Sequence, residues 1–114
     1  MLTINGFLIS FLLNLMLFKN VEGYTVNFEI GKKLFNSNCI ACHQNGGNLI
    51  IPEKNLKKSI LEINGMDSLE AIMYQILNGK NGMPAFGGRL SEKEIEEIAN
   101  YVILSAEKNF KLND

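Results

Sequence analysis

Residues that are mostly apolar recur at the spacing of α-helices in four segments after position 30. Side chains at i, i+3, i+4 and i+7 share one face of a helix. The positions concerned are Gly31, Leu34, Phe35 and Asn38; Leu56, Ile60 and Leu61; Leu69, Ile72, Met73, Ile76 and Leu77; and Ile95, Ile98, Ala99, Val102 and Ile103. No run alternates between apolar and polar residues as a strand would. The pattern predicts an all-α fold of about four short helices.

Local signals mark the beginnings of the last two helices. Ser68 is predicted to cap the third helix, and Ser91 followed by Glu94 has the spacing of a capping box for the fourth. In the first helix, Gly31 costs roughly 1 kcal/mol relative to Ala. We therefore expect another element to approach Gly31 closely.

The N-terminal segment has the pattern of a signal peptide. Residues 7–18 read FLISFLLNLMLF, which is too short for a comfortable membrane span of about 20 apolar residues. We expect cleavage after Gly23, which leaves a single domain over residues 24–114. No Lys or Arg precedes the apolar run, although a positive start is usual. An uncleaved anchor and a buried N-terminal helix are the alternatives.

Composition bounds the function without assigning it. The chain has 114 residues with 11 Lys plus Arg and 12 Asp plus Glu, so there is no basic field for a nucleic acid. The hydrophobic fraction of 46% is that of a folded domain. A mature chain of this size buries little apolar surface, so we expect another group to help fill the core.

Cys39, Cys42 and His43 form the C-x-x-C-H pattern of covalent haem attachment. Two thiols separated by two residues can reach the two vinyl groups of one porphyrin, and the adjoining histidine then lies beneath the iron as an axial ligand. Both cysteines and the single histidine of the chain are used in this way.

Other chemistries of Cys39 and Cys42 fit less well. A thioredoxin-like dithiol needs a βαβ setting that the helical pattern does not supply. A structural zinc site needs four ligands, and a blue-copper site needs two histidines, so both fail on the ligand count. A structural disulfide would close a very small loop and leave His43 without a role.

Met83 is the candidate for the second axial ligand. It lies in Asn81-Gly82-Met83-Pro84, where Pro84 favours an extended backbone before it and Gly82 loosens the chain. A loop can present this thioether to the iron, whereas Met73 lies on an apolar helical face where core packing is expected. His/Met ligation favours electron transfer over reaction at the iron.

Three segments resemble the cytochrome c6 family, the soluble photosynthetic class I cytochromes c of algae and cyanobacteria. They are Cys39 to His43, NGMPAFGGRL at residues 81–90, and EIANYV at residues 97–102, and IPEK at residues 51–54 adds to the likeness. The resemblance covers nearly all of residues 31–103. It implies a class I cytochrome c fold around one haem c and transfer of single electrons, without enzymatic activity, from cytochrome f of the cytochrome bf complex to photosystem I.

The resemblance also implies roles for individual residues. Cys39 and Cys42 would hold the haem thioethers, and His43 and Met83 would be the axial iron ligands. Four further positions match the family: Gly31 and Tyr101 at the crossing of the first and last helices, Gln75 near the haem in ordinary high-potential members, and Arg89 in docking to photosystem I. The tryptophan common near the family's end is absent, and Phe110 lies nearby instead.

The resemblance further implies a monomer in the thylakoid lumen. No long Ser- and Arg-rich transit region precedes the apolar run, and the chain is rich in Asn, Ile and Lys, which favours a plastid genome over a cyanobacterial one. Clusters of opposite charge indicate a dipolar docking surface. They comprise Lys54, Lys57 and Lys58 on one side and Glu92, Glu94, Glu96 and Glu97 on the other. The alternative is that the glutamates only complement the macrodipole at the start of the last helix and contact no partner.

Two alternatives remain. A bacterial periplasmic cytochrome that feeds a reductase or an oxidase would carry the same His/Met motifs. A haem enzyme or gas sensor would require the Met83 bond to be absent or labile.

Overall fold

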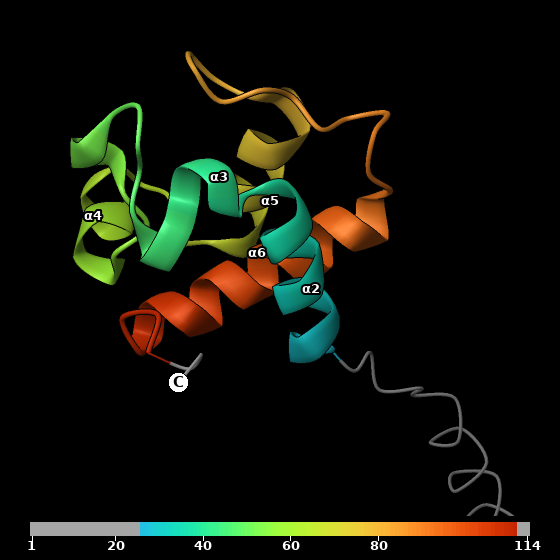
Figure 1. Ribbon diagram of the computed structural model, residues 1–114, viewed down its shortest axis with the longest axis horizontal. Helices are drawn as coiled ribbons and strands as arrows, with labels where there is room; N and C mark the ends of the chain where they lie inside the picture. Colours follow the sequence, from blue (N-terminus) through green and yellow to red (C-terminus); the bar gives the residue numbers. More distant parts are fainter. Residues whose placement is uncertain (1–25, 112–114) are drawn as a thin grey trace, which may run out of the picture.

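The computed structural model describes residues 26–111, which form five α-helices and two 3-10 turns (Figure 1). In chain order they are α2 (Phe28–Asn38), α3 (Ile40–His43), η2 (Gln44–Gly46), η3 (Pro52–Lys54), α4 (Lys58–Ile63), α5 (Leu69–Asn78) and α6 (Glu92–Glu107). Within this part of the chain, β pairing is confined to two isolated bridges. The predicted all-α fold is confirmed.

The boundaries of two helices differ from the sequence expectation. α2 begins three residues earlier than Gly31, because the Asn27 side chain caps it by accepting the backbone N–H groups of Glu29 and Ile30. α4 begins after Leu56, whose N–H donates to the carbonyl of Gly46 at 2.7 Å and is therefore held in the preceding loop.

α2 and α6 cross in contact at Gly31, as predicted. A Cβ atom at Gly31 would lie 2.9 Å from Tyr101 Cβ and would also overlap the carbonyl oxygen of Glu97. The Tyr101 ring is buried between Phe28 and Phe35, with centroid distances of 5.1 and 5.0 Å. Aromatic pairs at this spacing stabilise the crossing beyond their buried area.

Both predicted caps are present. Ser68 Oγ accepts the N–H of Ala71 at 3.2 Å at the start of α5. At the start of α6, Ser91 Oγ accepts the N–H of Glu94 at 3.1 Å, and the Glu94 carboxylate accepts the N–H of Ser91 at 2.9 Å. These bonds fix where α5 and α6 begin.

The prediction that Glu97 belongs to an exposed acidic cluster at the start of α6 is wrong. Glu97 is only 3% exposed and accepts the N–H of Asn27 at 3.1 Å, so it ties the start of α2 to α6. It therefore adds nothing to a docking surface. In the basic cluster, Lys58 is paired with Glu107 at 2.9 Å, and this pair raises the pKa of Lys58.

The chain after α6 turns back onto the core. Phe110 is buried and packs beside Phe35 and Tyr101, with centroid distances of 6.3 and 6.4 Å. A Cβ atom at Gly46 would lie within van der Waals overlap of the Phe110 ring. Phe110 therefore fastens the end of the chain against the loop that follows His43.

The predicted signal peptide, residues 1–23, lies outside the described residues. No helix within residues 26–111 is long and apolar enough to cross a membrane.

Candidate haem-binding site

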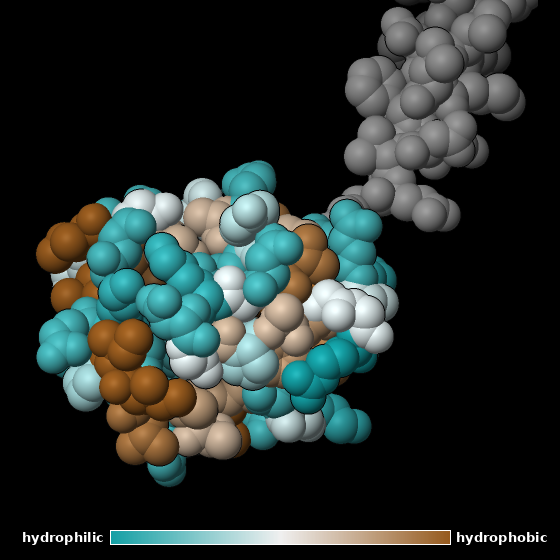
Figure 2. Space-filling view, turned by 90° about the horizontal axis from the view of Figure 1, so that it is seen from above, coloured by the Kyte–Doolittle hydropathy of each residue, from teal (hydrophilic) through white to brown (hydrophobic). Residues whose placement is uncertain are grey.

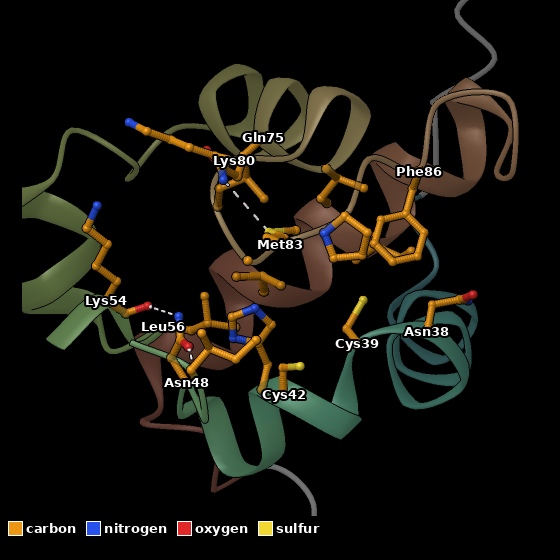
Figure 3. Close-up of a pocket in the computed structure, with 18 of the residues that line it drawn as sticks. Asn38, Cys39, Cys42, Asn48, Lys54, Leu56, Gln75, Lys80, Met83 and Phe86 are labelled. Carbon is orange, nitrogen blue, oxygen red and sulfur yellow. Dashed lines mark hydrogen bonds between the residues drawn. The ribbon is translucent and has the colours of Figure 1, made fainter. Parts of the chain in front are cut away.

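A cavity of about 510 Å³ lies between α3, α5, α6 and the loops that follow α3 and α5 (Figure 3). This volume is in the range of cofactor pockets. Its wall is largely apolar and includes Phe35, Ile51, Leu56, Leu61, Ile72, Ile76, Pro84, Phe86, Ile98 and Val102. All four predicted haem residues, Cys39, Cys42, His43 and Met83, line this cavity.

Cys39 and Cys42 are brought to one side of the cavity by a break in the helix. Cys39 ends α2, and its carbonyl accepts the N–H groups of Cys42 at 3.2 Å and His43 at 2.9 Å, which starts the short helix α3. The two thiols are not joined by a disulfide. Figure 3 shows both side chains on the opposite side of the pocket from Met83.

The burial of Cys39 does not favour dithiol chemistry. Burial raises the pKa of Cys39 to about 11, since a low-dielectric surrounding disfavours the thiolate. A dithiol oxidoreductase needs a thiolate near neutral pH, which requires a lowered pKa. The described residues also contain no group of three His, Cys, Asp or Glu side chains placed to hold a metal ion. The raised pKa of Cys39 therefore does not favour a dithiol oxidoreductase.

His43 is oriented by the loop that follows it. Its Nδ1 lies 2.8 Å from the carbonyl oxygen of Gly47, a geometry in which Nδ1–H donates. This bond directs Nδ1 toward the loop and leaves Nε2 as the ring nitrogen that is available to coordinate a metal. Histidines that bind metals commonly use their second nitrogen in this way.

A tight turn presents Met83. The N–H of Lys80 donates to the carbonyl of Met83 and the N–H of Met83 donates to the carbonyl of Lys80, both at 3.0 Å. From α5, Gln75 Nε2 lies 3.8 Å from Met83 Sδ and donates to it (Figure 3). The sulphur of Met83 thus has a defined position at the cavity. It lies on the side of the cavity opposite α3, the helix that ends at His43.

These residues fit a haem. The cavity provides two thiols on one wall, an imidazole with a free Nε2, a thioether held from another element, and an apolar lining. A porphyrin requires an apolar lining and burial. By filling this cavity, it would also complete the core of so small a domain.

Sequence reasoning missed several residues that shape this site. Asn48 Oδ1 accepts the N–H groups of Ile50 and Ile51, and Asn48 Nδ2 donates to the carbonyl of Lys54 at 2.9 Å, which closes the loop below the cavity. The Gly47 carbonyl that orients His43 was also missed. An Asn beside glycines signals a turn, but it does not reveal which backbone groups the turn satisfies.

The other predicted positions divide into two groups. Gln75 and Arg89 line the cavity, whereas Met73 packs against the core, as expected. The Arg89 guanidinium lies 5.0 Å from the centroid of the Phe86 ring, a cation–π distance, and the Arg89 residue is exposed.

Comparison with known proteins agrees with this fold. Residues 26–102 match the family model described as cytochrome c oxidase, cbb3-type, subunit III. The chain is 55% identical over 84 residues to cytochrome c6 of Bumilleriopsis filiformis, covering 74% of this chain and 98% of that protein. It is 48% identical over 99 residues to cytochrome c6 of Synechococcus sp., covering 87% of this chain and 88% of that protein.

A solved structure gives the same result. Cytochrome c6 from the diatom Phaeodactylum tricornutum superposes with a TM-score of 0.70 at 47% identity, covering 73% of this chain and 98% of that one. The fold and the site therefore define a class I cytochrome c. Within that class, the chain belongs to the cytochrome c6 family. Membership assigns it to haem-containing electron carriers of the photosynthetic type and not to enzymes.

Proposed function

We propose that the chain carries single electrons from cytochrome f of the cytochrome bf complex to photosystem I. The observation that supports this most is the convergence of Cys39, Cys42, His43 and Met83 on one apolar cavity. With two axial positions filled, such a centre exchanges electrons and leaves no site for a substrate. Family membership supports the photosynthetic setting.

Each residue has a role in this proposal. Cys39 and Cys42 hold a haem c through thioether bonds, and His43 and Met83 coordinate its iron. When bound, this group supplies one-electron Fe(II)/Fe(III) chemistry. The apolar wall excludes water, and the Gly47 and Gln75 contacts hold His43 and Met83 in place before and after electron transfer.

The surface around the cavity suits brief docking. Leu49 and Ile50 follow the site and are 76% and 57% exposed. Figure 2 shows hydrophobic residues gathered at one side of the face seen from above. Small exposed apolar areas with charged neighbours allow fast encounter and release, which a shuttle requires.

We place the protein in the thylakoid lumen of a plastid, as a monomer, after removal of residues 1–23. The lumen is the compartment in which the proposed partners meet, and the apolar segment at residues 7–18 supports export. A cyanobacterial lumen or a bacterial periplasm is the alternative setting.

Reconstitution tests the proposed partners. The haem-loaded protein is mixed with the soluble domain of cytochrome f and, separately, with photosystem I particles, and electron transfer is followed after a laser flash. We expect fast oxidation by photosystem I and fast reduction by cytochrome f, both slowed by added salt. Transfer to a bacterial oxidase alone, with neither photosynthetic partner active, would favour the periplasmic alternative.

Arg89→Glu is expected to slow oxidation by photosystem I. Charge reversal at an interface rim acts mainly on the association rate, so we expect about a tenfold decrease at low salt. The measurement is the second-order rate after a flash, with Lys33→Glu as a control of equal charge change on α2. An equal decrease in both variants would assign the effect to net charge and not to Arg89.

Gln75→Leu is expected to lower the reduction potential by tens of millivolts, on the order of one hydrogen bond. The Gln75 amide donates to Met83 Sδ and draws electron density from it, which favours Fe(II). Voltammetry of the variant measures the change, and Tyr74→Phe, on the exposed side of α5, is the control. An unchanged potential in Gln75→Leu would contradict this role.

A further inference from the structure

Four Asn-Gly pairs occur in the described part of the chain, namely Asn45-Gly46, Asn64-Gly65, Asn78-Gly79 and Asn81-Gly82. An Asn followed by Gly is the pair in which the side-chain amide is most readily attacked by the next backbone nitrogen, since Gly adds no side chain to obstruct the approach. The backbone conformation decides which pair reacts in the folded protein.

Asn81 and Gly82 are the two central residues of the turn closed by Lys80 and Met83. Asn81 has a φ of 53°, whereas Gly82 is not among the glycines with positive φ. A positive φ at the first central position alone is the signature of a type II′ turn, in which that residue has a ψ of about −120°. At this ψ the next backbone nitrogen eclipses Cβ of an L-residue, so the nitrogen of Gly82 lies on the side of the Asn81 side chain.

The other three pairs lack this geometry. The ψ of Asn45 is 30° and that of Asn64 is 5°, which turn the next nitrogen away from the side chain. Asn78 lies inside α5 and is helical. None of the three backbones brings the reacting atoms together.

Hydrogen bonds also distinguish Asn81 from Asn64 and Asn78. The Asn64 amide donates to Ile60 O and the Asn78 amide donates to Tyr74 O, both at 3.0 Å. The N–H groups of the following glycines also donate, to carbonyls of α4 and α5. Among residues 26–111, neither the Asn81 amide nor the Gly82 N–H has a hydrogen-bond partner, and both residues are exposed.

We propose that Asn81 is a site of spontaneous deamidation. The Gly82 nitrogen bonds to Asn81 Cγ, the Cγ–Nδ2 bond breaks, and the amide nitrogen leaves as ammonia with the proton from Gly82. Water then opens the five-membered succinimide. Breaking the ring bond to Cγ gives an aspartyl residue, and breaking the ring bond to the backbone carbonyl carbon gives an isoaspartyl residue.

The modification changes the rim of the haem cavity, which Asn81 lines. Both products replace a neutral amide with a carboxylate beside Lys80, and the isoaspartyl product adds a carbon to the backbone of the turn that presents Met83. The reaction itself requires neither the haem nor the partners of the proposed function, so each can fail without the other.

Tryptic peptides measure the sites separately. Cleavage after Lys80 and Arg89 isolates residues 81–89 with Asn81-Gly82 alone, and residues 59–80 carry the two pairs at Asn64 and Asn78 as an internal control. The haem-loaded protein is incubated near pH 8, digested and analysed by mass spectrometry. We expect Asn81 to be converted at least about tenfold faster than either control, equivalent to about 1.4 kcal/mol of local opening.

Two comparisons make the test decisive. In denaturant, the rates at the three sites should become similar, because the turn and the helices are lost. Gly82→Ala should slow conversion of Asn81 severalfold, and its new Cβ meets only the flexible side chain of Ile50, at 3.1 Å. Equal native rates at the three sites, or an unchanged rate in Gly82→Ala, would overturn the proposal.

Discussion

Met83→Ala is expected to retain covalent haem, to lower the reduction potential by on the order of 0.2 V and to bind carbon monoxide promptly when reduced. Cys39 and Cys42 are untouched by the change, so attachment persists. Loss of the thioether removes a ligand that favours Fe(II) and opens one axial position. Voltammetry gives the potential, and the visible spectrum under carbon monoxide reports the open iron.

Two matched variants serve as controls for that experiment. Met83→Leu keeps the volume of the side chain and removes only the sulphur, so it should show the same spectral change if the sulphur is the ligand. Met73→Leu makes the same substitution on α5, where Met73 packs against the core, and should leave the potential and the gas binding unchanged. An unchanged potential in Met83→Leu would show that Met83 is not the ligand.

Gly31→Ala is expected to destabilise the fold by about 1–3 kcal/mol, the usual cost of overpacking. At an open helical position the same change stabilises by roughly 0.5–1 kcal/mol, so the sign of the effect reports the crossing. The new Cβ would lie 2.9 Å from Tyr101 Cβ and would overlap the Glu97 carbonyl, both on α6. Neither the Tyr101 Cβ nor the Glu97 backbone can move without shifting the helix.

Unfolding in guanidinium, followed by circular dichroism, measures this cost. Ser37→Ala is the control on the same helix, since Ser37 is exposed and bonds only to the carbonyl of Lys33. We expect its free energy of unfolding to stay within a few tenths of a kcal/mol of that of the parent. A raised midpoint in Gly31→Ala would mean that α2 and α6 do not approach as closely as described.

Residues with local causes were predictable from the sequence. Ser68, Ser91 and Glu94 act within one turn of their own position, so their spacing alone predicted the caps. Gly31 was predictable because a glycine inside a helix has a cost that a close contact explains. The C-x-x-C-H pattern placed three side chains of the site because all three lie within five residues.

Contacts between distant segments were not predictable in the same way. The sequence pattern placed Glu97 in an exposed acidic cluster. Only the crossing of α2 and α6 reveals that its carboxylate accepts the backbone N–H of Asn27. The family likeness placed Gln75 near the haem but not its donation to Met83 Sδ, which depends on how the loop after α5 folds back. Phe110 reaches Gly46 across more than sixty positions of sequence, a pairing that no local pattern contains.

The most direct test of the central claim is the visible and near-infrared spectrum of the protein made with a haem-attachment system. We predict the haem bands shifted by thioether attachment and, in the oxidised form, the weak sulphur-to-iron band of His/Met ligation. Covalent haem without that band would contradict the role of Met83, and absence of haem would contradict the assignment of Cys39, Cys42 and His43.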